Sequence, residues 1–283
     1  MLDELRYRRN LLRYPAGMRA GIDPTDPATR SLRLSGIAQG ANIVNLLTGK
    51  PGAVQFIPAF ALDGVVGPAF NAFNVNDQTN FTGLTTNDTS ITIAAIIRFN
   101  SVASNQVVAS TSSNNAGWRL LVSGGTLQLT AGAVADLPSS TTLVANVPYL
   151  IIASGNASVA NFLALQLDTG KITTSTRSGA TPVAPNSIYT IGGWNAFGQC
   201  SNGKLAAVMI SANFMSLQEM RQWARDPWAF WYPRRQRDLA APGVTLVNKT
   251  LPAAAGTYAL SPSVTPVATK VNRRLIAEPC LGS

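Results

Sequence analysis

The 283 residues of this chain include no histidine, so it cannot carry out chemistry that depends on this side chain. A Ser-His-Asp triad, a Cys-His pair and a histidine-ligated zinc site are therefore excluded. Histidine is also the side chain that most often acts as a general base. Any acid–base catalysis would have to rely on carboxylates.

Glycosidases use two carboxylates that lie about 5–9 Å apart. The chain holds three glutamates, Glu4, Glu219 and Glu278, and no E-x-D-x-x-E pattern. Two of them lie close to the chain ends, and Glu219 lies in a helix cap. Five aspartates have Asn, Gly or Pro within two residues, which is typical of turns: Asp63, Asp77, Asp88, Asp136 and Asp168. We expect turn formers here, and no catalytic residue.

Cofactor motifs are also missing. The glycine pairs Gly124–Gly125 and Gly192–Gly193 belong to no G-x-x-x-x-G-K-[ST] or G-x-G-x-x-G pattern, so no nucleotide loop is implied. Cys200 and Cys280 form no CxxC pair, and their spacing leaves a disulfide between them undecided. We expect no cofactor.

The segments that would position any functional site are predicted to be strands. Apolar, β-rich runs recur between Gly, Asn and Ser clusters, and this spacing predicts an all-β sandwich or barrel. The runs are 90–99, 106–110, 118–123, 126–130, 141–144, 148–154, 162–168, 187–193 and 203–211.

One helix interrupts the strands. Ser216 and Glu219 form a capping box, and Pro227 cannot continue a helix, so we expect a helix from about Leu217 to Arg225. The aromatic run that follows, DPWAFWYP at 226–233, is too apolar to remain in water. We expect it to fill a groove in the sandwich or a subunit interface.

Charge divides the chain into three parts. Residues 1–50 carry eight basic and four acidic residues, residues 51–220 five and six, and residues 221–283 nine and three. We therefore expect an extended basic N-terminal arm at 1–54, a sandwich at 55–239 and an Ala/Pro/Thr-rich tail at 240–283. Basic arms can bind nucleic acid, a membrane or acidic protein surfaces.

Both arms are expected to be ordered by contact with other chains. No nucleic-acid-binding module surrounds the basic segments, so an acidic neighbouring subunit is the preferred partner. The interface residues proposed on this basis are Arg6, Arg8, Arg9, Arg13, Trp228, Phe230, Trp231, Arg234, Arg235 and Arg237.

Membrane insertion and secretion are not expected. No apolar run reaches the 18 or so residues that a membrane span needs. The N-terminal sequence MLDELRYRRNLLRYP lacks the apolar core of a secretory signal. We expect the chain to be made and assembled in the cytoplasm of its host.

Taken in order, several segments resemble the laminin-G-like, concanavalin-A-like domains of phage structural proteins. The resemblance covers about Ala61 to Pro233. It is carried by the strand SITIAAIIRF, by WRLLVSGGTL at 118–127, by PYLI at 148–151, by the I-G-G strand end at 191–193, by GKLAAVMI at 203–210 and by the helix start LQEM at 217–220.

The resemblance implies a two-sheet antiparallel jelly-roll sandwich with one short C-terminal helix. Some domains of this kind bind Ca²⁺ through loop carboxylates, for which Asp77 and Asp88 are the candidates. The family's usual His after the Trp/Tyr is absent, and Gln199-Cys200-Ser201 replaces an inner aromatic residue. Carbohydrate binding is therefore not carried over from the family.

Three functions remain open. The leading hypothesis is a non-enzymatic structural protein of a phage particle (a tail or neck accessory or a head decoration protein), forming a homo-oligomer and docked by its arms. The second is a glycan-binding module for host adhesion on the same particle, and the third is a glycan-cleaving enzyme.

Overall fold

The computed structural model describes a β-rich body between residues 12 and 232. The described residues are 12, 14–15, 20–22, 29, 31–39, 42–55, 59–72, 78–84, 88–111, 116–132, 134–183, 188–193 and 202–232. Among these residues, no helix is long and apolar enough to cross a membrane. Cys200, Cys280, Asp77 and the tail at 240–283 lie outside the described residues.

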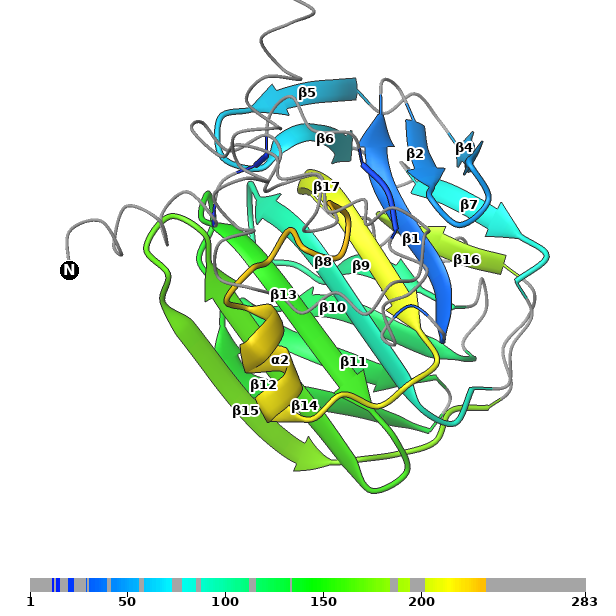
Figure 1. Ribbon diagram of the computed structural model, residues 1–283. Coiled ribbons are helices and arrows are strands. Elements are labelled where there is room, and N and C mark those ends of the chain that lie inside the picture. The colour runs from blue at the N-terminus through cyan, green and yellow to red at the C-terminus, as the bar shows by residue number, and fades with distance from the viewer. Residues whose placement is uncertain are drawn as a thin grey trace, which may run out of the picture. The chain divides into compact units, whose positions relative to one another are not determined.

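The described strands form two antiparallel sheets, which confirms the expected all-β sandwich. A ten-stranded sheet has the order β15-β14-β13-β8-β17-β1-β2-β3, with the β5–β6 hairpin attached to β17, and a seven-stranded sheet has the order β12-β11-β10-β9-β16-β7-β4. Figure 1 shows the ten-stranded sheet nearer the viewer and the seven-stranded sheet behind it. The strands are β1 Leu32–Gln39, β2 Asn42–Asn45, β3 Lys50–Pro51, β4 Ala53–Gln55, β5 Ala59–Asp63, β6 Gly67–Ala72, β7 Gln78–Thr82, β8 Ile91–Phe99, β9 Gln106–Ser110, β10 Trp118–Ser123, β11 Thr126–Ala131, β12 Ala135–Thr142, β13 Pro148–Gly155, β14 Val159–Gln166, β15 Ile172–Ser178, β16 Ile188–Ile191 and β17 Gly203–Ser211.

The main core lies between the two sheets. Alternate residues of β8 point into it, among them Ile91, Ile93 and Phe99, and they meet inward residues of the seven-stranded sheet such as Trp118 and Tyr189. All five side chains are at most 1% exposed. Burying a single large apolar side chain stabilises the fold by about 1.5–3 kcal/mol, so this layer is the main source of stability.

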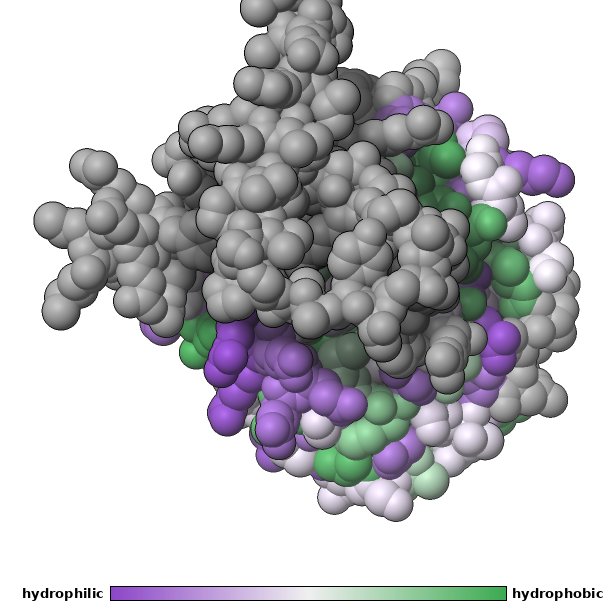
Figure 2. Space-filling model, in the orientation of Figure 1, coloured by the Kyte–Doolittle hydropathy of each residue, from purple (hydrophilic) through white to green (hydrophobic). Residues whose placement is uncertain are grey.

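A second apolar layer covers the other face of the ten-stranded sheet. The alternate β8 residues Ala94 and Ile96 point into it and belong to the same cluster as Met220 and Trp223 of α2, which spans Leu217–Trp223. Figure 1 shows α2 on the near face of this sheet. Its exposed side is hydrophilic in Figure 2, as expected for an amphipathic helix on an apolar surface. The ten-stranded sheet is thus apolar on both faces.

The helix prediction was right in type and start. Ser216 accepts a hydrogen bond from the Glu219 backbone N–H, and the Glu219 carboxylate accepts one from the Ser216 backbone N–H at 2.7 Å, so the capping box is confirmed. The helix ends at Trp223, with Ala224 as its C-cap, two residues before the expected Arg225.

The boundary expected at residue 54 is wrong. Strand β1 lies inside the ten-stranded sheet, between β17 and β2, and Leu34 and Ile43 belong to the main core. Gly36 explains why β1 fits there, since an added Cβ would lie 2.8 Å from Ile43 Cγ2 and 2.9 Å from Val208 Cγ1. Strands β1 to β4 are therefore part of the sandwich.

Other strands departed from expectation for similar reasons. The strand expected at 141–144 lies earlier, at 135–142, as the outermost strand of its sheet. It contains Pro138, which an outermost strand tolerates because only one of its sides is hydrogen-bonded to a neighbour. Strands β1–β7 and β15 were not predicted, because their sequences are short, polar or interrupted by Gly and Pro.

A fragment spanning residues 55–239 should fail to fold. It lacks β1, β2 and β3 and leaves one edge of β17 unpaired, with the core contacts of Leu34 and Ile43 lost. We expect no cooperative thermal transition in circular dichroism. A fragment of residues 12–233 is the control and should melt cooperatively; equal melting of both fragments would contradict this placement of β1.

Candidate functional site

The aromatic residues after α2 form a compact cover on the ten-stranded sheet. This aromatic cover consists of Trp223, Trp228, Phe230, Trp231 and Tyr232. Neighbouring rings are 4.8–6.5 Å apart, from the tilted pair of Trp223 and Phe230 to the edge-on pair of Trp228 and Trp231. The three tryptophans are at most 9% exposed, which confirms their expected burial, and Phe230 is half-buried.

Part of the expected N-terminal arm packs against this cover. The Tyr14 ring meets Trp228 edge-on at 5.5 Å and Tyr232 at 5.9 Å. The indole N–H of Trp228 donates to the Leu12 carbonyl at 3.3 Å. Gly67, at φ +75°, leaves room for the Tyr14 ring, since an added Cβ would lie 2.3 Å from Tyr14 Cγ. The expectation that only other chains order this segment is wrong for these residues.

The proposed interface residues divide into two groups. Trp228 and Trp231 have no exposed side-chain surface in the single chain. Of the two expected alternatives, a groove in the sandwich or a subunit interface, these two side chains therefore follow the first. A partner could touch only the half-buried Phe230 among the three aromatic interface residues. The other proposed residues lie outside the described residues, and their interface role stays a prediction: Arg6, Arg8, Arg9, Arg13, Arg234, Arg235 and Arg237.

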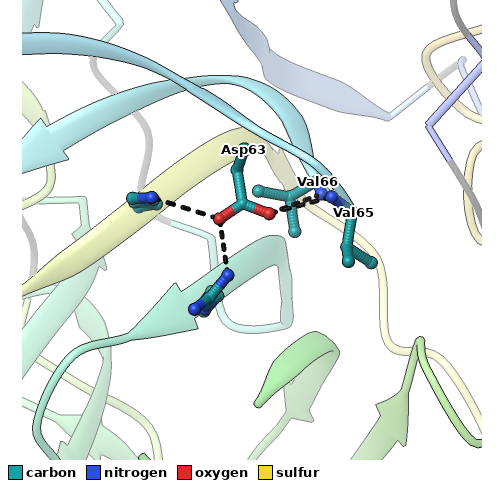
Figure 3. A network of polar contacts seen from close by, with 5 residues as sticks. Asp63, Val65 and Val66 are labelled. Carbon is teal, nitrogen blue, oxygen red and sulfur yellow. Dashed lines mark hydrogen bonds and ion pairs between the residues drawn. The ribbon is translucent and has the colours of Figure 1, made fainter. Parts of the chain in front are cut away.

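Asp63 is a buried carboxylate whose role the sequence did not reveal. One carboxylate oxygen accepts the backbone N–H groups of Val65 at 2.9 Å and Val66 at 3.2 Å. The other oxygen lies 2.8 Å from Arg98 Nη1 on β8 and 3.2 Å from Lys204 Nζ on β17. Figure 3 shows the carboxylate between these two sets of donors. The ion pairs tie the β5–β6 hairpin to the two central strands of the large sheet.

The surroundings of Asp63 favour its ionised form. Burial by itself would raise the pKa, but the two backbone N–H groups, the Lys204 ammonium and the Arg98 guanidinium outweigh it and hold the pKa below its ordinary value of 3.8. A carboxylate neutralised by two cations is a poor proton donor or nucleophile. Asp63 is a structural residue.

Two of the other aspartates that the sequence singled out, Asp88 and Asp136, are engaged as well. Both Asp88 oxygens accept from Arg33 of β1, at 2.9 and 3.2 Å, and the Asp88 carbonyl accepts the Trp118 indole N–H at 3.0 Å. The Asp136 carboxylate accepts from the Thr130 hydroxyl at 2.8 Å. Among the described residues no group of three or more potential ligands could hold a metal ion. The calcium hypothesis gains nothing from Asp88.

A polar row crosses the outer face of the ten-stranded sheet. Adjacent strands place its members in direct register, and we call it the ten-strand row: Ser211, Thr92, Ser154, Asn161 and Thr176. The loop before α2 docks on it. The Thr92 hydroxyl donates to the Asn213 carbonyl at 2.8 Å, and Ser154 Oγ accepts from the Met215 N–H at 2.7 Å. This row positions the helix.

A second polar row crosses the outer face of the seven-stranded sheet. Register pairs connect six adjacent strands, and we call it the seven-strand row: Asn80, Thr190, Ser110, Arg119, Thr130 and Asp136. Burial lowers the pKa of the Arg119 guanidinium, and nearby Asp136 opposes that shift. Sequence reasoning missed the row, because alternation within single strands does not reveal which residues become neighbours across them.

A shallow hollow lies at one end of the sandwich. It has a volume of about 500 Å³ and is lined by residues 101–103, 124–125, 142–143 and 145. Its lining holds no charged side chain, so it offers no group for acid–base chemistry. The seven-strand row is not an open surface, because its five members other than Asp136 are at most 8% exposed.

Truncating Trp228 should weaken the fold strongly. W228A removes a fully buried ring that contacts Tyr14, Trp231 and Tyr232, and such truncations destabilise proteins by about 3–5 kcal/mol. Urea unfolding followed by far-UV circular dichroism measures the change. F230A is the matched comparison and should destabilise less, since Phe230 is half-buried; the opposite order would argue against this packing.

Removing the Asp63 charge should lower stability in a pH-dependent way. Because its folded pKa lies below 3.8, the ionised carboxylate contributes fully above that pH, and the contribution disappears as pH falls through the folded pKa. D63N should lose about 2 kcal/mol at pH 7, the scale of hydrogen bonds to charged groups. Unfolding at pH 7 and pH 3 measures both effects. A D63N deficit of the same size at both pH values would show that the charge is not responsible.

The comparisons with known proteins support the fold of this chain and do not show its function. No protein-family model and no curated protein matches the chain. Among solved structures, the binding domain of botulinum neurotoxin serotype D/C VPI 5993 is similar, with a TM-score of 0.50 and 13% identity over 70% of this chain and 52% of that one. The present chain thus spans about half of that domain.

Two further structures are similar over smaller shares of their own length. A Trypanosoma rangeli sialidase in complex with sialic acid has a TM-score of 0.48 and 14% identity, over 80% of this chain and 38% of the other. The enzymatically active domain of tailspike protein 2 from bacteriophage CBA120 has a TM-score of 0.42 and 22% identity, over 58% of this chain and 28% of the other. At these identities, what the comparisons support is an all-β sandwich fold.

Proposed function

We propose that this chain is a non-enzymatic structural protein of a phage particle, which displays the sandwich and is docked by its basic terminal segments. The observation that carries the proposal is how charge is divided between the folded body, with the bounds seen in the structure, and the two terminal segments. Residues 31–232 carry nine basic and seven acidic residues, residues 1–30 six and four, and residues 233–283 seven and two. The largest excess of positive charge follows the last strand and helix.

The body neutralises much of its own charge. Arg33 pairs with Asp88, and both Arg98 and Lys204 pair with Asp63. The positive charge of the C-terminal segment has few acidic residues of its own to pair with. A segment with this charge favours an acidic surface on other virion proteins, or on a second copy of the chain, as its partner. The proposed location is the virion, after assembly in the host cytoplasm.

The absence of an enzymatic role is part of the proposal. The chain has no histidine, and its buried carboxylate among the described residues, Asp63, is held between two cations. The ordered resemblance to laminin-G-like segments of phage structural proteins supports the virion setting. Neither point depends on the solved structures named above.

Removing the C-terminal segment should leave folding unchanged and prevent incorporation into particles. A chain ending at residue 233 keeps all described strands and α2, so its melting temperature should match that of the full chain. Its incorporation into particles should be lost, as measured by quantitative proteomics of purified virions. The triple variant R234Q/R235Q/R237Q tests charge alone, and its docking should be weaker and less sensitive to salt. Normal incorporation of the shortened chain would refute docking through this segment.

A second candidate is a glycan-binding module used for host adhesion from the same particle. The sandwich fold, which the chain shares with the neurotoxin binding domain named above, is compatible with this candidate. A glycan array probed with the full chain tests this candidate. A reducing-sugar assay on the same glycans tests the third alternative, a glycan-cleaving enzyme, for which no carboxylate pair is evident among the described residues.

A further inference from the structure

The hollow at one end of the sandwich is open to solvent. It lies among three loops, which connect β8 to β9, β10 to β11 and β12 to β13. Ala103, Gly124 and Thr142 of its lining are exposed, and Val102 and Ala145 are half-buried. Another molecule can therefore reach this surface, in contrast to the seven-strand row.

An exposed apolar residue, Val144, lies beside this hollow. It is 57% exposed, and its chain neighbours Leu143 and Ala145 line the hollow. A single exposed valine is common on protein surfaces, so its exposure alone indicates no partner. Here, however, the exposed side chain and the hollow belong to the same loop. A surface with a projection and a hollow side by side can be complementary to a second copy of itself.

Hydrogen bonds hold the three loops in place. The Val144 N–H donates to the hydroxyl of Tyr149 at 3.1 Å, and Tyr149 is 1% exposed. The Leu143 N–H donates to the Gly125 carbonyl at 2.7 Å, and the Gly125 N–H donates to the Val102 carbonyl at 2.7 Å. Each loop is thus bonded to another or to the core. A surface formed in advance loses less conformational entropy when it binds.

This end of the sandwich has very little charge. Between Arg98 and Asp168 the sequence holds two charged residues, Arg119 and Asp136. Arg119 is 7% exposed, and Asp136 lies near the start of β12, whereas the hollow adjoins the end of that strand at Thr142. Burying the loop end therefore removes no charged side chain of the hollow from water. Depletion of charged residues is typical of the centre of a protein–protein interface.

The net charge of the chain favours a second copy as the partner at this end. The chain carries a net charge of +9, so two copies repel each other wherever their basic residues approach. A contact through an uncharged surface keeps these residues apart. An acidic partner, by contrast, would gain no electrostatic attraction at the hollow. A second copy can thus meet this chain at the loop end with the least repulsion.

We infer that the chain forms a two-fold dimer through this loop end, in which Val144 of each copy enters the hollow of the other. A two-fold interface uses the same patch of both copies, so each supplies one valine and one hollow. Stable interfaces bury about 800 Å² on each partner, so the remainder of loops 100–105, 124–125 and 143–147 takes part in the contact. This dimer goes beyond the proposed docking function, because it concerns the folded body and not the terminal segments.

Analytical ultracentrifugation of the purified full chain over a range of concentrations tests the dimer. V144D places a carboxylate where the dimer would bury the valine, and it should raise the dissociation constant at least about thirtyfold, as expected for an interface anchor. Far-UV circular dichroism checks that the variant is folded, which is expected because Val144 is exposed. Should V144D fail to fold, A103E carries the same prediction from the hollow side of the contact.

The matched control is V183D, which changes a valine that is 52% exposed in the same way. The Val183 N–H donates to the carbonyl of Gly132, which follows β11, whereas Gly125 precedes that strand. Val183 thus lies at the opposite end of β11 from the hollow, and V183D should dimerise like the wild-type chain. Loss of the dimer in V183D would place the contact elsewhere and overturn the inference.

Salt distinguishes this contact from association through the basic terminal segments. An uncharged interface should persist or strengthen at an ionic strength of about 0.5 M, because salt screens the repulsion between the two positive copies. Dissociation by salt would show that charged segments connect the copies and would overturn the inference, as would a wild-type chain that stays monomeric or a dimer that survives V144D. The dimer is measured in the purified chain and docking in particles, so either proposal can fail without the other.

Discussion

The structure depends on a sheet that is apolar on both faces. Strand β8 places Ile93 and Phe99 in the core between the sheets and Ala94 and Ile96 on the opposite side. A sheet of this kind must be covered twice, because either face left in water would expose a large apolar area. The seven-stranded sheet covers one face. The chain itself covers the other, with α2, the aromatic cover and the segment that carries Tyr14.

That requirement explains several features that are unrelated in sequence. The capping box starts α2 at the place where the ten-strand row holds its preceding loop. The tryptophans after α2 complete the outer layer, and Tyr14 packs against them from a position more than two hundred residues earlier. The Asp63 ion pairs hold the β5–β6 hairpin onto the same sheet. Each of these elements therefore helps to cover the same apolar face of the ten-stranded sheet.

The outer face of the seven-stranded sheet is also covered along the seven-strand row, where all members but Asp136 are at most 8% exposed. There the chain presents aligned polar groups beside a small apolar cluster, and two buried oxygens lack partners among the described residues. The positive charge, by contrast, is concentrated after residue 232. The folded body and the largest excess of positive charge thus lie in different parts of the chain.

The sequence by itself determined the fold class, the helix and the chemistry that is absent. Alternating apolar strands, a capping box and a lack of histidine are local properties, so they can be read without knowing which segments meet. The boundary at residue 54 failed for the opposite reason. Strand β1 has weak local signals, and its place is decided by Leu34, Gly36 and their contacts with Ile43 and Val208.

Only the tertiary structure decided which polar residues act together. Asp63 reads as a turn residue, and its role depends on Arg98 and Lys204, which lie 35 and 141 residues away. Thr190 and Asn80 become neighbours through strand register alone. Register follows from the packing of the whole sheet, and no single strand contains that information. Long-range pairing, more than residue type, decides which polar residues form each row in this protein.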